Sequence, residues 1–197
     1  ANFKIGERKV GPGNPTYIIF EVASTHANDW NIARDYVQQA ADAGADAVKF
    51  QLFEAEKLVN PLTVPLQKTM DYFKTAEVPR EWFLKLKKLC GQRGIDLLCT
   101  PFDEEAAVFL YKEVGLPAVK IASGDLTHYP LLEKAASFKK PIILATGMAT
   151  LAEIKGAVSV LKKNGNSEIA LLQCVSVYPT SFEDANVSAI NDLRKNF

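Results

Sequence analysis

Two short apolar segments of this 197-residue chain each carry a single lysine. The first is Pro117-Ala-Val-Lys-Ile-Ala-Ser-Gly-Asp125, whose composition and flanking turn residues predict a buried parallel strand. Because side chains alternate between the faces of a strand, Lys120 shares its face with Ala118 and Ala122. Lysine is rarely buried without a partner. Because both alanines are small, they leave room for such a partner, an anion or a carbonyl group, beside the ammonium. The alternative is a lysine that extends its ammonium to solvent at the strand end.

The second segment, Gly44-Ala-Asp-Ala-Val-Lys-Phe-Gln51, has the same design. Here Ala47, Lys49 and Gln51 share one face of the predicted strand. Two interior strands that each carry a lysine near the carboxyl end are hard to explain by packing. Paired ammonium groups at strand ends suit a phosphate or a carboxylate, so the sequence predicts an anion-binding site.

Strand-like and helix-like runs alternate along the chain and position these lysines. Six runs are predicted as strands: residues 17–22, 45–51, 95–100, the run around Lys120, 141–146 and 168–175. Helix start signals follow each strand: Asn28 or Asp29, Pro79, Asp103, Pro130, the capping box of Thr150 and Glu153, and Val187. Residues 52–78 hold two prolines and show weak periodicity, which predicts a loop that covers the site and becomes ordered when ligand binds.

Alternating strands and helices require a parallel sheet with right-handed crossovers. A doubly wound sheet and a (β/α)8 barrel both satisfy this rule. The barrel is favoured because polar residues end every strand, whereas a doubly wound sheet gathers ligand contacts at one switch point. These residues are Glu21, Lys49 with Gln51, Thr100, Lys120, Thr146 and Gln173. We therefore expect an N-terminal hairpin and linker over residues 1–15 and, over residues 16–197, an α/β TIM (β/α)8 barrel of which about six βα units are present.

Composition excludes several functional classes. Lys and Arg total 23, as do Asp and Glu, so no charge excess indicates nucleic-acid binding. No apolar run is long enough for a membrane helix, and no dinucleotide or phosphate-loop motif follows the first strand. The three cysteines have no metal-site spacing, which predicts reduced thiols and a cytoplasmic location.

Five stretches of the chain resemble the sialic acid synthase family, in the family's order. They are Ala43–Gln51, Cys99–Asp103, Val119–Asp125, Ala145–Met148 and Tyr178–Thr180. The family includes N-acetylneuraminate, legionaminate and pseudaminate synthases and spore-coat polysaccharide relatives. The resemblance implies a TIM barrel that condenses phosphoenolpyruvate with an N-acetylated amino sugar, uses a divalent metal, Mn or Mg, and forms a homodimer.

Carried over by position, the resemblance implies roles for particular residues. Glu21 matches the catalytic acid and Lys120 a catalytic lysine. Those implied to contact phosphoenolpyruvate are Lys49, Thr100, Lys120 and Ser123. Those implied to contact the sugar are Gln51 and Tyr178. Further substrate-binding positions are Thr146, Gln173 and Ser176. A carboxylate such as Glu21 is suited to stabilise the cation that develops at C2 of phosphoenolpyruvate, or to move a proton.

Departures from the family's pattern cluster on the predicted active face. Ala23-Ser24-Thr25 precedes His26 where the family has Gly-x-Asn, Ala145 replaces a serine, Gln173 a histidine and Ser176 an asparagine. This clustering suggests a changed sugar or weakened chemistry. The family's metal ligands are two histidines on later strands, so they are not in this sequence; His26 and His128 are interpreted as ordinary loop histidines. We expect two further barrel units and a sugar-binding extension downstream of residue 197.

Two alternatives remain open. In a class I aldolase, Lys120 would form a Schiff base with a keto substrate. In a non-catalytic relative, the chain would keep a phosphoenolpyruvate-shaped pocket without turnover.

Overall fold

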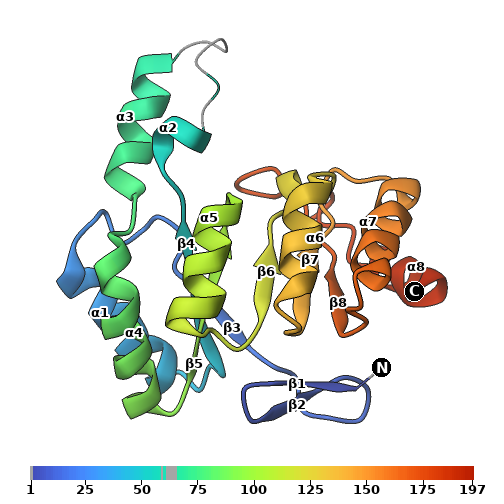
Figure 1. The fold of residues 1–197 in the computed structure, drawn as a ribbon, viewed down its shortest axis with the longest axis horizontal. Coiled ribbons are helices and arrows are strands. Elements are labelled where there is room, and N and C mark those ends of the chain that lie inside the picture. Colours follow the sequence, from blue (N-terminus) through green and yellow to red (C-terminus); the bar gives the residue numbers. More distant parts are fainter. Residues whose placement is uncertain (1, 59, 61–65) are drawn as a thin grey trace. The chain divides into compact units, whose positions relative to one another are not determined.

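The structure is a computed structural model that describes residues 2–58, 60 and 66–197. The chain folds as two compact units, one ending at Pro117 and the other running from Ala118 to Phe197 (Figure 1). Each is an α/β unit built on a three-stranded parallel sheet, as the alternation of strands and helices predicts.

The first unit begins with two short antiparallel strands, β1 (Phe3–Ile5) and β2 (Arg8–Val10). Its sheet has the order β3-β4-β5, with β3 at Ile19–Glu21, β4 at Ala47–Leu52 and β5 at Asp96–Pro101. The middle strand β4 is almost wholly buried, because Ala47, Val48 and Phe50 are inaccessible to solvent. A continuous apolar run of this kind is typical of a parallel strand covered on both faces.

Helices α1 (Trp30–Asp42) and α4 (Arg80–Arg93) lie side by side and pack against β4 and β5 (Figure 1). The Asp29 carboxylate accepts hydrogen bonds from the first turn of α1, and Gly94 ends α4 in a left-handed conformation. Of the two candidates that the sequence offered for the start of α1, Asn28 and Asp29, the cap is Asp29.

The prediction of a loop over residues 52–78 is wrong in part. The segment contains helices α2 (Ala55–Leu58) and α3 (Leu66–Ala76). Both prolines precede Leu66 in the sequence and so cannot interrupt α3, and Phe73 of this helix packs edge to face on Phe53. The suggestion that this segment orders on ligand binding stays a prediction, and residues 59 and 61–65 lie outside the described part of the chain.

The helix predicted from Asp103 to Val114 has an unexpected second half. It starts as α5 (Glu104–Val108), capped by the Asp103 carboxylate, and continues as the π-helix η1 (Phe109–Val114) up to Gly115. Within η1 the Tyr111 hydroxyl donates a hydrogen bond to the Cys99 carbonyl at 2.7 Å, which ties this helix to β5.

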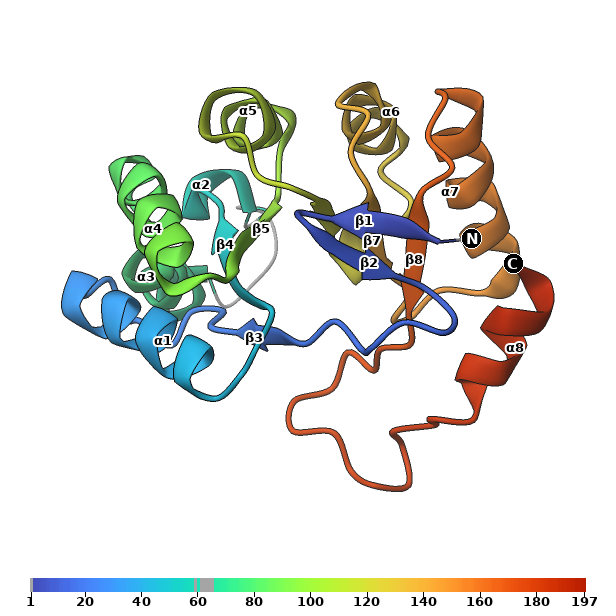
Figure 2. The ribbon, with the colours of Figure 1, turned by 90° about the horizontal axis from the view of Figure 1, so that it is seen from below.

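The second unit has the sheet order β6-β7-β8. Its strands are β6 (Val119–Ile121), β7 (Ile142–Ala145) and β8 (Ile169–Leu172). Helices α6 (Tyr129–Ser137) and α7 (Leu151–Lys163) lie side by side over one face of this sheet (Figure 2). The predicted capping box is present, since Thr150 and Glu153 exchange hydrogen bonds at the start of α7. The short η2 (Ser123–Asp125) follows β6, and α8 (Ala189–Asn196) follows β8.

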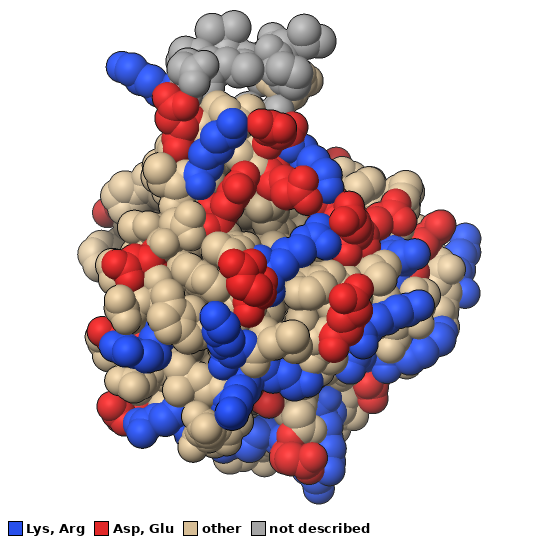
Figure 3. Space-filling view, turned by 60° about the vertical axis from the view of Figure 1, so that its left-hand side comes forward, with Lys and Arg blue, Asp and Glu red and all other residues tan. Residues whose placement is uncertain are grey.

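The surface drawn in Figure 3 carries intermixed positive and negative side chains. The ion pairs of the first unit include those in which Lys57 contacts Glu54 and Glu105, and Arg80 contacts the same two carboxylates. Across the described part of the chain, no helix is both long and apolar enough to cross a membrane.

Candidate anion-binding site at the strand ends

Lys49 is the centre of the predicted site in the first unit. Its side chain is buried, and its residue stands opposite Glu21 in the parallel pairing of β3 and β4. The Lys49 ammonium forms an ion pair with the Glu21 carboxylate and lies 3.4 Å from the Thr100 hydroxyl on β5. Three predicted site residues from three adjacent strands therefore meet.

Gln51 and Thr100 extend this group, because they are register partners in the pairing of β4 with β5. The Glu21 carboxylate is held from a second side by the Ala23 backbone N–H at 3.0 Å, and Ala23 has a positive φ of 49°. The carboxylate is thus fixed at the carboxyl end of β3, where about half of its side chain stays exposed to solvent.

A buried thiol lies near this cluster. The Cys99 thiol is fully buried, and this burial raises its pKa well above the ordinary value, although the nearby Lys49 ammonium acts in the opposite direction. It therefore stays a neutral packing group.

His26 lies in the loop between β3 and α1, yet its side chain is inaccessible to solvent. Its ring contacts the rings of Phe50 and Trp82, its Nδ1 accepts a hydrogen bond from the Asn28 N–H at 3.0 Å, and its Nε2 has no partner among the described residues. Burial lowers the pKa of the imidazole. The residue is thus a buried core histidine, which a loop position in the sequence did not indicate.

Lys120 is the corresponding lysine of the second unit, and only 7% of it is exposed. Its ammonium donates a hydrogen bond to the Ile121 carbonyl at 2.7 Å. The alternative of a lysine extended into solvent does not fit this burial. Asp125, in η2, has a carboxyl group whose pKa burial raises, with His128 and Lys120 acting in the opposite direction.

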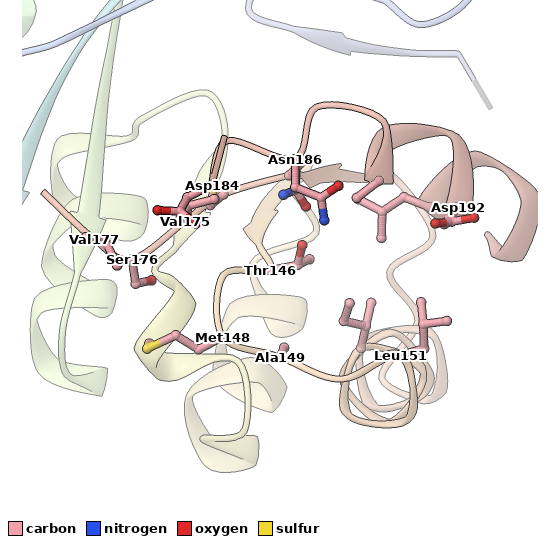
Figure 4. Close-up of a pocket in the computed structure, with 15 residues that line it drawn as sticks. Thr146, Met148, Ala149, Leu151, Val175, Ser176, Val177, Asp184, Asn186 and Asp192 are labelled. Atoms are coloured by element: carbon pink, nitrogen blue, oxygen red, sulfur yellow. The ribbon is translucent and has the colours of Figure 1, made fainter. Parts of the chain in front are cut away.

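Loops after β6, β7 and β8 bring a second set of predicted residues together. The Ser123 hydroxyl accepts a hydrogen bond from the Gly147 N–H at 3.0 Å, and the Thr146 hydroxyl donates to the Leu172 carbonyl at 2.9 Å. Thr146, Gln173 and Ser176 line a cavity of about 480 Å³ between α8 and the loops after β7 and β8 (Figure 4).

The same cavity is lined by polar residues that the sequence did not single out: Asp184, Asn186 and Asp192. Figure 4 shows Asn186 and Thr146 pointing toward one another. The sequence could have indicated these residues only by their position after the last strand. That position does not tell which side chains point into the cavity. Tyr178, in contrast, is 91% exposed and is not part of this lining.

A metal centre has no support among the described side chains. Nowhere in residues 2–58, 60 and 66–197 do three His, Cys, Asp or Glu side chains gather as a metal ion would require. The residues present therefore do not fit the divalent metal that the resemblance implies, and we derive no chemical step through it.

Parallel α/β units with polar side chains at the strand ends fit a TIM-barrel-like fold, and comparison with solved structures shows such a fold among synthases. The sialic acid synthetase of Leptospira borgpetersenii, solved in complex with citrate, superposes with a TM-score of 0.93 and 37% identity, over 100% of this chain and 67% of that one. Residues 36–197 match the NeuB family. The chain belongs to the NeuB family.

Two relatives show the extent of the likeness. An uncharacterized protein of Methanocaldococcus jannaschii is 44% identical over 98% of this chain and 56% of its own length. The N,N'-diacetyllegionaminic acid synthase of Legionella pneumophila is 36% identical over 100% of this chain and 59% of its own length. The chain thus spans somewhat more than half of each.

Proposed function

We propose that this chain carries the phosphoenolpyruvate-binding part of a synthase that joins phosphoenolpyruvate to an N-acetylated amino sugar and releases phosphate. The observation that supports it most is the burial of Lys49 and Lys120 at strand ends, in a family whose named members make sialic-type acids. Two desolvated ammonium groups suit a substrate that carries both a phosphate and a carboxylate.

The reaction would use these residues as follows. C3 of phosphoenolpyruvate forms a bond with the aldehyde carbon of the open-chain sugar, whose oxygen takes up a proton. Positive charge develops at C2, and water adds there and loses one proton. The bond from C2 to the phosphate oxygen then breaks while the remaining hydroxyl proton passes to the departing phosphate, which gives the keto acid and phosphate. Glu21 is proposed to stabilise that charge or to accept the proton, and its contacts with Lys49 and the Ala23 N–H support this role.

The architecture that fits this proposal is a partial (β/α)8 barrel of about six units with its ligand at the carboxyl ends of the strands. The division into residues 1–15 and 16–197 belongs to the same proposal, as do homodimer formation and a cytoplasmic location. Tyr178 and Gln51 are proposed to contact the sugar.

Isothermal titration of the 197-residue chain with phosphoenolpyruvate tests the proposal. Lys49→Ala and Lys120→Ala are each expected to weaken binding by more than about tenfold, because each removes a buried charged partner of the anion. Lys88→Ala and Lys155→Ala, which change exposed lysines on α4 and α7, are matched controls and should bind as the wild type does. Unchanged titrations for both buried-lysine variants would remove the assignment.

The aldolase alternative is favoured by one observation, the desolvation of Lys120, since Schiff-base lysines are commonly desolvated. Borohydride treatment in the presence of pyruvate separates the two functions. Covalent labelling at Lys120 would support the aldolase, whereas a chain that binds phosphoenolpyruvate and shows no labelling would support the synthase.

A further inference from the structure

His26 is the buried anchor of the loop between β3 and α1. Within residues 22–29, only Val22 and His26 are buried. The His26 ring is inaccessible to solvent, and its centroid lies 6.1 Å from the ring centroid of Phe50 on β4 and 6.1 Å from that of Trp82 on α4. The loop is therefore fixed to the core through this one side chain.

The backbone of this loop is held in an unfavourable conformation. Ala23, Ala27 and Asn28 have positive φ values of 49°, 49° and 53°. Alanine adopts this left-handed region only at a cost, because its Cβ approaches the following carbonyl oxygen. Residues held in such a conformation persist where the surrounding contacts fix them. The contact that fixes this loop must therefore be sought among its side chains.

The His26 ring supplies that contact. Its Nδ1 accepts a hydrogen bond from the Asn28 N–H at 3.0 Å. This bond closes a side-chain turn around the two consecutive left-handed residues, Ala27 and Asn28. A ring nitrogen that accepts a hydrogen bond carries no proton, so the neutral ring has its proton on Nε2. Burial lowers the pKa of the imidazole and so favours this neutral form.

The other ring nitrogen shows that packing alone does not account for a histidine here. Nε2 is buried and has no hydrogen-bond partner among the described residues. A buried donor without a partner destabilises the fold, and an apolar side chain would fill the same space without this cost. What an apolar side chain would lack is the acceptor at Nδ1.

The other end of the loop carries Glu21. The Ala23 N–H donates to the Glu21 carboxylate at 3.0 Å, and the same carboxylate forms the ion pair with Lys49. Lys49 and Phe50 are consecutive on β4, so their side chains point to opposite faces of the sheet. The loop thus connects an anchor on the Phe50 face with a carboxylate on the Lys49 face.

We propose that His26 is a positioning residue for Glu21. Its Nδ1 fixes the conformation of the loop between β3 and α1, and the loop in turn holds the Ala23 N–H against the Glu21 carboxylate. The inference rests on the proposed function for the role of Glu21 in the reaction, and it adds the residue that sets the direction of this carboxylate.

Two amide substitutions in the 197-residue chain separate this role from packing. In His26→Asn the side-chain oxygen can take the place of Nδ1 and accept from the Asn28 N–H. In His26→Gln the amide lies one methylene further out, where Nε2 was, and the turn loses its acceptor. A side chain that only fills space would be replaced better by glutamine, because asparagine leaves the larger cavity. The two roles therefore predict opposite orders of the two variants.

Hydrogen exchange of single amides, followed by nuclear magnetic resonance at neutral pH, measures the effect. In His26→Gln the amides of Asn28 and Ala23 should both exchange faster by about tenfold or more, the scale of one lost hydrogen bond. In His26→Asn both rates should stay within about threefold of the wild type. The amide of Phe50 in β4 reports the global stability of each variant.

Glu21→Ala is the matched control for the direction of the coupling. It removes the acceptor of the Ala23 N–H and leaves the His26 turn intact. Exchange should therefore accelerate at Ala23 and stay at the wild-type rate at Asn28.

Several results would overturn the inference. One is an unchanged rate at Ala23 in His26→Gln, and another is an acceleration in His26→Asn that equals or exceeds that in His26→Gln. If His26→Gln fails to fold by circular dichroism, the tautomer of the wild-type ring decides, since nitrogen chemical shifts that place the proton on Nδ1 exclude the turn. Exchange is measured without substrate, so a chain that binds no phosphoenolpyruvate refutes the proposed function and still shows what His26 holds.

Discussion

Glu21 and Lys49 are direct register partners on the adjacent parallel strands β3 and β4, and their side chains form an ion pair whose two members differ sharply in burial. The Lys49 side chain is 8% exposed and that of Glu21 is 45% exposed. Removal of one partner therefore has a different cost from removal of the other. Water can solvate a half-exposed carboxylate that has lost its partner, but it cannot reach a buried ammonium.

Glu21→Gln is accordingly expected to destabilise the chain more than Lys49→Met. The loss for Glu21→Gln should be about 1–3 kcal/mol at neutral pH, below the cost of breaking a fully buried pair because water partly reaches this one. Urea unfolding followed by circular dichroism measures both variants. Equal losses, or a larger loss for Lys49→Met, would contradict this account.

Gly6→Ala should destabilise the turn between β1 and β2 more than Gly13→Ala. Both glycines have positive φ, so the backbone penalty is shared. Only at Gly6 would the new Cβ meet another group, the Asp96 carboxylate at 2.6 Å, and this carboxylate is held in place by the Tyr17 hydroxyl at 2.7 Å. We expect an extra loss of about 1–3 kcal/mol in the free energy of unfolding. Indistinguishable unfolding midpoints for the two variants would argue against it.

The buried His26 predicts a loss of stability in mild acid. Its pKa in the folded chain lies below the ordinary value of 6.5, so the unfolded chain binds the proton more readily. The destabilisation that His26 causes is absent above the pKa of the unfolded chain. It grows as the pH falls below that pKa, by at most about 1.4 kcal/mol per pH unit. The raised pKa values of Asp96 and Asp125 act with the opposite sign at lower pH, because their folded forms hold the proton more tightly.

Comparison with His26→Gln isolates the histidine from these carboxyl groups. Between pH 7 and pH 5, the free energy of unfolding of the wild type should fall relative to that of the variant. Parallel pH profiles for the two chains would show that His26 does not titrate on unfolding.

The three cysteines should react at different rates with a thiol reagent. Burial raises the pKa of the Cys90 thiol to about 12, and that of the fully buried Cys99 also lies well above its ordinary value. Cys174, in the loop after β8, is partly exposed. Dithionitrobenzoate at pH 8 should label Cys174 in the folded chain and all three thiols in denaturant. Rapid labelling of a Cys174→Ser variant would be inconsistent with this burial.

Much of the fold was predictable because it depends on local patterns. All six strand segments were located from short apolar runs between turn residues. The Thr150 capping box was predicted directly, and Asp29 was one of two candidates for the cap of α1. Several strands are shorter than predicted, such as Ile19–Glu21 within residues 17–22, whereas β5 keeps its predicted length and lies one residue further along, at Asp96–Pro101. Their ends depend on hydrogen bonds to neighbouring strands, which a local pattern does not contain.

The site was predictable in part. Alternation along a strand indicated that Lys49 and Lys120 face inward, and both are buried. The pairing of Lys49 with Glu21 depends on strand register, and the burial of His26 depends on rings from β4 and α4, so neither follows from local sequence. The roles of the residues in catalysis and substrate binding stay predictions until the titrations above are made.

The π-helix η1 has a consequence for how this chain tolerates changes in length. A π-turn accommodates one residue more than an α-turn in the same rise, so Phe109–Val114 is a place where a single-residue deletion can be absorbed by conversion to regular α-helix. Deletion of the exposed Lys112 would therefore change the pitch of one turn, whereas the same deletion within α4 would rotate its buried side chains away from the sheet. Length variation among related chains is expected to be accepted at this turn and rejected in the regular helices around it.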